Sequence, residues 1–281
     1  MRIFGLDFTS TPRRKKPITC AVGELQGSHL HIHDCMDMAS MVAFEAFLRT
    51  PGPWLAACDF PFGQPEKLRS NLSWPTRWEE YIAVIAALSK REFEQVLEHY
   101  RSGRSAGDKQ HLRVVDRYAG ACSPMMLHRV PVGKMFFQGA PRLLAAGVSI
   151  LPCCPTNDDR IVVEGYPALV ARRWVGRSSY KSDERGKQTE EKEEARRCIV
   201  RGLCSHELFD HYGLTLEVAS EMADILIREP MADNLDAVLC AIQAAWAYTK
   251  RSEGYGIPVE CSKDEGWIVS QETLIAWTDA H

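Results

Sequence analysis

The sequence predicts an α/β fold in which a mixed five-stranded sheet is flanked by helices, with a helical and loop insertion between strands 4 and 5. Three short apolar strand patterns follow one another at the start, as in an antiparallel meander. A helical pattern then precedes a continuous apolar run at residues 53–60, which is typical of a strand buried on both faces. Residues 66–148 interrupt this order with helical periodicity and with stretches rich in Gly, Pro, Arg and His.

The elements are expected in a simple order along the chain. Strand patterns occur at residues 1–8, 18–25, 27–35, 53–60 and 160–164. Helical patterns occur at 38–49, where Asp37 is expected to cap the helix, and at 78–102, 167–176 and 231–248. The charged segment 177–203 is typical of an exposed loop followed by a solvated helix. The end of the chain is expected to form a small hairpin or strand over the core.

Length and composition indicate one soluble globular domain. A chain of 281 residues can bury one large core, so we expect a single domain over residues 1–281 that contains the insertion 66–148. Hydrophobic residues make up 45% and charged residues 25% of the chain, which is ordinary for a soluble protein. The net charge of −3 gives no global basic field, although a local basic patch is sufficient for binding nucleic acid.

The sequence indicates a cytoplasmic protein without a membrane partner. No apolar run approaches the roughly 20 residues that span a bilayer, and the first residues lack the zones of a signal peptide. Ten cysteines occur at irregular spacing, many in apolar contexts such as those of Cys58 and Cys240. Such cysteines are typical of buried thiols in a reducing compartment, and no C-x-x-C pair indicates structural zinc.

Acidic residues stand at the ends of several apolar elements. Asp7, Asp59 and Glu164 end strands, and Asp233 and Asp236 open the apolar helix "DNLDAVLCAIQAAWAY". If strands 1, 4 and 5 are parallel neighbours, their carboxyl ends share one edge of the sheet, where open α/β folds place their sites. Carboxylates gathered there lose hydration and repel one another, so a divalent cation would stabilise them. A set of oxygen ligands without cysteine or histidine favours Mg²⁺ or Mn²⁺.

Helix and turn capping is the simpler explanation for each acid alone. Asp7 and Asp59 are placed to accept hydrogen bonds from the turns that follow them, and Asp233 is placed to cap its helix. Asp236 lies one turn inside the helix on a face that continues with Leu239, so capping explains it less well. We therefore expect Asp236 to be a ligand, while Asp233 stays open between a cap and a ligand.

The ordered motifs resemble known families. The β-β-β-α-β order with Asp7, Asp59 and an Asp-x-x-Asp helix resembles the ribonuclease H-like superfamily, and "DNLDAVLCAIQAAW" is similar to the late helix of its RuvC-type Holliday junction resolvases. Together, "GLDFTS", "CDFPFG", "VEGYPALVAR" and "DNLDAVLCAIQAAWA" resemble family number 429 among the domains of unknown function, regarded as predicted nucleases of this fold. Two features depart from the pattern: resolvases usually carry Glu where Asp59 stands, and Glu164 has no standard counterpart in the smaller enzymes.

The resemblance implies a metal-dependent nuclease that hydrolyses phosphodiester bonds of DNA or RNA by a two-metal mechanism. The catalytic residues that it implies are Asp7, Asp59, Glu164 and Asp236, and the metal ligands are Asp7, Asp59, Asp233 and Asp236. The cations expected to bind substrate phosphate are Arg113, Arg117, Lys181 and Arg185, although each is also typical of a surface charge. Tyr180 or Trp174 would stack on a base.

Two other functions stay open. "GLDFTST" also resembles the first phosphate loop of actin-like phosphotransferases that use ATP, but Thr9 stands where those loops usually carry glycine. No second glycine-rich loop follows the fourth strand, where "CDFPFGQP" carries two prolines. A non-catalytic nucleic-acid-binding module of the same fold is the other alternative. The choice between DNA and RNA and the oligomeric state are not indicated by the residues.

Overall fold

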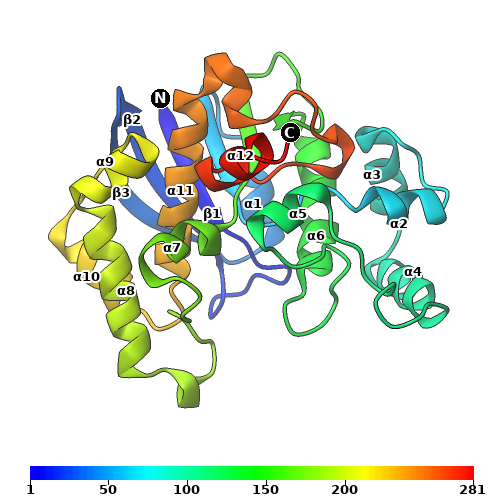
Figure 1. Cartoon of the computed structure of the whole chain (residues 1–281), viewed down its shortest axis with the longest axis horizontal. Coiled ribbons are helices and arrows are strands. Elements are labelled where there is room, and N and C mark those ends of the chain that lie inside the picture. The colour runs from blue at the N-terminus through cyan, green and yellow to red at the C-terminus, as the bar shows by residue number, and fades with distance from the viewer.

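A seven-stranded mixed sheet forms the centre of the molecule in a computed structural model that describes residues 1–281 (Figure 1). The strand order is β5-β6-β4-β1-β2-β3-β7. The strands are β1 (Arg2–Asp7), β2 (Ile18–Gln26), β3 (His29–Met38), β4 (Trp54–Cys58), β5 (Ser149–Leu151), β6 (Arg160–Glu164) and β7 (Thr215–Val218). The expectation of five strands is therefore wrong, because β5 and β7 are only three and four residues long and too short to show a strand pattern.

The strands that carry acids are parallel neighbours, which is the condition under which the sequence places their acids together. β1, β2 and β3 form the antiparallel meander, and the chain then crosses through α1 (Met41–Leu48) to return as β4 beside β1. β6 pairs with the other side of β4, also in parallel. The carboxyl ends of β1, β4 and β6 therefore lie together at one end of the strands. The short strands β5 and β7 are the two edge strands of the sheet.

Helices follow the sequence patterns with several differences, among them two helices within residues 204–230, where none was expected. The remaining helices are α2 (Glu66–Asn71), α3 (Trp78–Ala86), α4 (Lys90–Ser102), α5 (Val114–Ala119), α6 (Val132–Ala146), α7 (Pro167–Val175), α8 (Glu190–Leu203), α9 (His206–Tyr212), α10 (Ser220–Arg228), α11 (Asp233–Thr249) and α12 (Gln271–Thr278), with 3-10 segments η1 (Arg185–Lys187), η2 (Arg251–Gly256) and η3 (Lys263–Glu265). The single helix expected at 78–102 is two helices, because Ser89 and Glu92 form a capping box that starts α4. Ser40, not Asp37, caps α1. The expected terminal hairpin is instead α12, preceded by an isolated bridge between Ile268 and Glu164.

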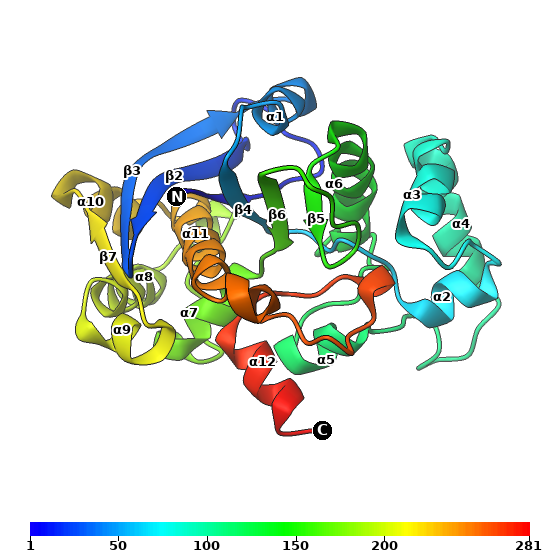
Figure 2. The same cartoon turned by 90° about the horizontal axis from the view of Figure 1, so that it is seen from above.

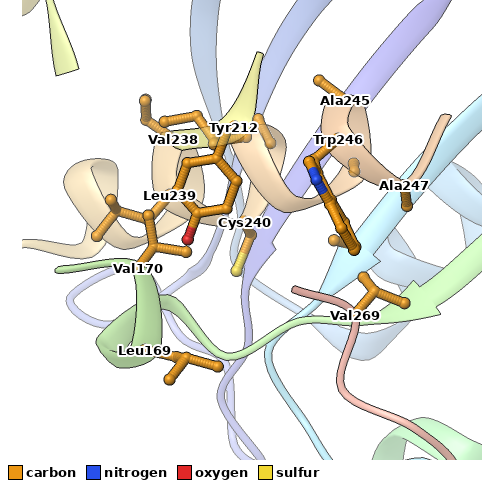
Figure 3. Close-up of a cluster of buried hydrophobic side chains, with 14 of the residues drawn as sticks. Leu169, Val170, Tyr212, Val238, Leu239, Cys240, Ala245, Trp246, Ala247 and Val269 are labelled. Carbon is orange, nitrogen blue, oxygen red and sulfur yellow. The ribbon is translucent and has the colours of Figure 1, made fainter. Parts of the chain in front are cut away.

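Helices cover both faces of the sheet (Figure 2). On one face, α1 and α6 contribute Phe44 and Phe136 to a buried cluster. On the other face, α7 and α11 pack with their apolar residues, as Figure 3 shows around Leu239 and Trp246. α11 lies directly on β1, where a Cβ atom added to Gly5 would overlap the helix backbone. The small Gly5 therefore allows β1 and α11 to approach closely, which fixes the position of the helix above the strand.

Residues 66–148 contain five helices and no strand. Part of this segment belongs to the core, because Tyr81 of α3 and Leu143 of α6 are completely buried in the cluster under the sheet. The helices α2, α3 and α4 lie together at one side of the molecule (Figure 1). None of the helices combines the length and the apolar character that a membrane crossing requires.

Candidate acidic site

Strand register brings Asp7 and Asp59 side by side. Leu6 pairs with Cys58 in the parallel ladder, and the amide of Asp59 donates a hydrogen bond of 3.0 Å to the carbonyl oxygen of Leu6. Side chains alternate between the two faces of a sheet, so Asp7 follows Ile3 toward the face covered by α11. Both carboxylates therefore lie at the end of the sheet on the side of that helix.

α11 supplies two further acids from its first turn. Asp236 is completely buried and Asp233 is 3% exposed. Of the two roles left open for Asp233, the structure does not show the cap, because Ala232 is the N-cap residue and the Asn234 amide donates instead to Glu229 Oε2 at 3.0 Å. Ala232 has a left-handed backbone with φ of 59°, which is strained for a residue other than glycine. The helix thus begins with a strained residue and with acids directed toward the sheet.

Lys181 and Tyr180 bind the carboxylate of Asp236. The Tyr180 hydroxyl donates to Asp236 Oδ1 at 2.6 Å, and the Lys181 ammonium donates to Oδ2. Tyr180 is buried, whereas the side chain of Lys181 is 42% exposed although its ammonium binds the fully buried Asp236. The segment expected to be a solvated loop therefore contributes a cation to the site. Burial opposes the charge of this ammonium, but Asp236 and Asp7 outweigh it and raise the pKa of Lys181.

Lys16 binds Asp233 from the turn between β1 and β2. Its ammonium lies 2.6 Å from Asp233 Oδ1 and 3.0 Å from Asp183 Oδ1 in the loop before α8. Burial disfavours the charged ammonium, but the hydrogen bond to Asp233 outweighs this and raises the pKa of Lys16. Lys16 therefore connects the first turn of the chain to α11 and to the loop that carries Lys181.

Negative charge exceeds positive charge at this site. Burial, followed by the charge of Asp236, raises the pKa of Asp7 well above its ordinary value. Burial also raises the pKa of Asp59 to about 7, and Lys181 only partly opposes this shift. No donor hydrogen-bonds to the side chain of Asp7 or Asp59. When ionised, the four aspartates carry two more charges than the two lysines neutralise.

Glu164 lies on the opposite face of the sheet. It pairs in register with Cys58, not with Asp59, so its side chain points away from α11. There it forms an ion pair with Arg113, with distances of 2.6 and 2.8 Å, and accepts the Phe62 amide at 2.9 Å. Arg113 also binds Asp116 at 2.7 Å. The carboxylate of Glu164 is thus part of a separate buried network.

That network uses all the donors of Arg113. A guanidinium has five N–H groups, and those of Arg113 bind Asp116, Glu164 and the carbonyl oxygen of Glu265. The side chains of Arg113, Glu164 and Asp116 are each at most 2% exposed. Arg113 therefore has no donor left for a phosphate, contrary to the role expected from the sequence.

The other predicted substrate residues are spread over the surface. Arg117 is exposed on α5 and Arg185 is exposed in η1, and neither forms an ion pair. Tyr180 is buried at the site, and Trp174 packs against Gly202 while donating to Glu207 at 2.8 Å. The ring of Tyr180 is therefore not free to stack on a base, while that of Trp174 is half-buried. Of the four predicted phosphate-binding residues, only Lys181 contacts the acidic site.

Two hollows meet at Lys181. One, of about 210 Å³, lies between Asp59, the β6–α7 turn with Tyr166, and Val130 and Val132 at the start of α6. The other, of about 310 Å³, is bounded by the end of α7 and by the loop from Arg177 to Ser179. We call them the apolar pocket and the polar hollow. Ala168 and Lys181 line both.

The comparison with known families identifies the chain. A family described as Protein of unknown function (DUF429) matches residues 5–259. The chain belongs to the DUF429 family. The matched range contains the four aspartates and both lysines of the acidic site. No curated protein and no solved structure matches the chain.

The acidic site of this DUF429 member offers the oxygen ligands that a hard cation prefers, but its side chains are not in coordinating positions. All its acids offer oxygen, which Mg²⁺ and Mn²⁺ prefer, and the excess of two negative charges equals the charge of one such ion. However, no three His, Cys, Asp or Glu side chains are close enough together to hold a metal. Asp7, Asp59 and Asp236 would be the holding residues, and Lys181 would have to leave Asp236.

The pKa of Asp59 gives the DUF429 protein a testable dependence of stability on pH. Its pKa is about 7 in the folded protein against an ordinary value of 3.8. Between these values the folded state keeps a proton that the unfolded state has released, so the contribution of Asp59 to stability falls as the pH rises from about 4 to about 7. We expect Asp59→Asn to reduce this fall in urea unfolding measured in EDTA. An equal slope in both proteins would contradict the burial of this charge.

Proposed function

We propose that the protein is a metal-dependent nuclease of the ribonuclease H-like superfamily, in its RuvC-like branch. The observation that carries this proposal is the convergence of Asp7, Asp59 and Asp236 from two parallel strands and one late helix, with excess negative charge. The antiparallel meander followed by α1 and a parallel β4 supports the same superfamily. This is a likeness of architecture, and the chemistry is inferred from the site.

Each residue of the acidic site has its own role in the proposed reaction. Asp7, Asp59 and Asp236 hold Mg²⁺ or Mn²⁺, and Lys16 orients Asp233 beside them. The bound metal supplies charge stabilisation for the attacking and leaving oxygens of a phosphodiester. Lys181 provides a positive charge at the same place for the phosphate of the substrate. Glu164 drops out of the proposed ligands because Arg113 and the Phe62 amide already occupy its oxygens.

A basic turn next to the site supports a nucleic-acid substrate. Arg13, Arg14 and Lys15 are exposed, form no ion pair, and follow one another in the turn between β1 and β2. The turn is closed by paired backbone hydrogen bonds between Arg13 and Lys16 of 3.0 and 2.9 Å. Lys16 in turn binds Asp233. Three free cations are thereby fixed beside the acids, where the backbone of a polyanion would pass.

Neutralising this turn is expected to weaken binding of nucleic acid. We expect Arg13→Ala/Arg14→Ala/Lys15→Ala to lower affinity and to reduce the slope of log K against log salt by about 2, because each phosphate contact contributes about 0.7 to 0.9. Fluorescence anisotropy with a labelled strand in EDTA measures both quantities over a series of salt concentrations.

The control changes the same total charge elsewhere. Lys90, Arg91 and Lys109 are exposed residues of the segment 66–148 and form no ion pair. Their triple substitution by alanine is expected to leave the slope unchanged. If both triple variants reduce the slope equally, binding follows net charge alone and the turn has no special role.

A non-catalytic nucleic-acid-binding module is the second candidate. The observation that favours it is that Lys181 and Lys16 already pair with Asp236 and Asp233, so the acids have cations of their own. The lack of three donors in coordinating positions points the same way. In this case the partly neutralised acids are a structural feature, and the basic turn is the functional surface.

Metal-dependent cleavage decides between the two candidates. Mn²⁺ binding is measured by titration, and cleavage is tested on single-stranded, duplex and branched DNA and RNA, each in Mg²⁺, Mn²⁺ and EDTA. The nuclease proposal expects cleavage that EDTA abolishes. Binding of nucleic acid without cleavage of any substrate would instead support the non-catalytic module.

A further inference from the structure

The apolar pocket beside the acidic site has no role in the function described so far. We propose that it receives one unpaired base of a single-stranded nucleic acid while a phosphate next to that base lies at the acidic site. This assignment rests on the proposed nuclease function and specifies its substrate. It follows from the position, the lining and the size of the pocket.

The position of the pocket couples it to the acids. Asp59 and Lys181 line the pocket, and both also belong to the acidic site, where Lys181 binds Asp236. The pocket extends from Asp59 and Phe60, just after β4, to Val132 and Met135 of α6. A group inside it is therefore next to two side chains of the acidic site. In a nucleic acid, that relation holds between a base and the phosphate adjacent to its sugar.

The lining of the pocket suits the face of an aromatic ring. Phe60, Pro61, Val132, Met135 and Tyr166 supply apolar and aromatic surface. The volume of about 210 Å³ is below the roughly 300 Å³ at which pockets begin to hold drug-sized ligands, so one ring system is the matching size. Burial of ring faces against such side chains gives affinity without reading sequence.

The polar groups of the pocket are mostly committed to one another. Arg113, Asp116 and Glu164 line it, but the five N–H groups of the arginine are all used by Asp116, Glu164 and the Glu265 carbonyl oxygen. The Tyr166 amide donates to Gln243 Oε1 at 2.8 Å. Few donors and acceptors remain to distinguish one base from another, so we expect little preference for a particular base.

The polar hollow continues the path of the strand. It meets the apolar pocket at Lys181 and Ala168 and is lined by Arg177, Ser178 and Ser179. Arg177 is exposed and forms no ion pair. Hydroxyl groups and an unpaired guanidinium suit a sugar and a phosphate. A base in one hollow and backbone in the other would bring the intervening phosphate past Lys181.

A duplex is expected to be a poorer substrate than a single strand. To enter the pocket, a base must be unpaired and unstacked, which costs least in a single strand. We therefore expect faster cleavage of a single strand than of the duplex of the same sequence.

An abasic scan of wild-type protein tests the pocket directly. Labelled single strands of one repeated base carry one tetrahydrofuran abasic residue, which is moved along the strand. If a base must occupy the pocket, cleavage at the one phosphate next to the abasic residue falls at least tenfold, the loss expected for one base contact. Cleavage that is equal at all phosphates overturns the pocket assignment. No cleavage of any strand by wild-type protein overturns the nuclease function, and the pocket assignment with it.

Filling the pocket gives an independent measurement. Ala168→Met places a longer side chain of α7 in the space that both hollows share. We expect it to raise KM for the intact strand about tenfold. The effect on cleavage beside an abasic residue is expected to be smaller. The matched control is Ala223→Met, which also changes a half-buried helical alanine but lies on α10, near the edge strand β7 (Figure 2). Equal effects of the two variants would contradict the assignment.

Discussion

Asp7→Asn is expected to lose metal-dependent cleavage by about 1,000-fold or more and, in EDTA, to unfold at a higher temperature than the wild-type protein. A bound metal contributes several kcal/mol to the transition state, and about 4 kcal/mol corresponds to about 1,000-fold. The gain in stability follows from burial: Asp7 is 7% exposed, and both desolvation and the neighbouring aspartates disfavour its charge. The amide of asparagine has the same shape but removes that charge. Stability and activity therefore change in opposite directions.

The opposite signs make the experiment informative. A variant that merely damages the fold loses activity and stability together, which would contradict the expectation for Asp7. Asp210→Asn is the control, because Asp210 is an exposed aspartate on α9 and its replacement is expected to change neither quantity. Cleavage by Asp7→Asn at the wild-type rate would show that Asp7 holds no metal needed for the reaction. Thermal unfolding with added Mn²⁺ completes the test, since the metal is expected to stabilise the wild-type protein and Asp210→Asn but not Asp7→Asn.

Arg113→Met is expected to destabilise the protein by about 3–5 kcal/mol, the usual effect of removing one partner of a buried ion pair. Arg113 is 2% exposed, and its loss leaves Glu164 and Asp116 buried without a cation. Methionine keeps much of the side-chain length, so the effect reports charge and hydrogen bonds more than packing. Urea unfolding at neutral pH measures the difference.

Two further variants test the role of the buried ion pairs of Arg113. Arg117→Met changes an exposed arginine of α5, the helix that Arg113 precedes, and is expected to stay within about 0.5 kcal/mol of the wild-type stability. Replacing Asp116, Glu164 and Arg113 together by apolar residues is expected to restore part of the stability, because no unpaired charge remains. If Arg113→Met is as stable as the wild type and instead binds nucleic acid weakly, Arg113 contacts phosphate as the sequence suggested.

Much of the sheet was predictable because its central strands are apolar and bounded by turns. The runs that became β1, β4 and β6 end in acids, and the prediction that these ends share an edge needed only their parallel order. β5 and β7 were not predictable, because three or four residues show no periodicity. The break between α3 and α4 was readable from Ser89 and Glu92, a capping-box pair within the periodic stretch.

The missed parts of the site depend on register and on long-range contacts. Glu164 pairs with Cys58, one residue before Asp59, and that offset places it on the other face, which no local pattern reveals. Lys16 meets Asp233 across 217 positions of sequence, and Lys181 meets Asp236 across 55. Both lysines lie in charged segments that are typical of solvated surface. The basic turn "TPRRKKP" directly after the strand of Asp7 was the one available signal for Lys16.

The close contact between Gly5 and α11 has a consequence for how the protein is made. During synthesis, the residues of β1 and β4 leave the ribosome before those of α11, so Asp7 and Asp59 exist at first without Asp236. The helix can dock on β1 only after residues 233–249 are synthesised, and only then can the aspartates gather. A nascent chain, or one shortened by a premature stop before residue 233, carries no assembled site. Any hydrolytic activity is thus confined to molecules whose synthesis has passed α11.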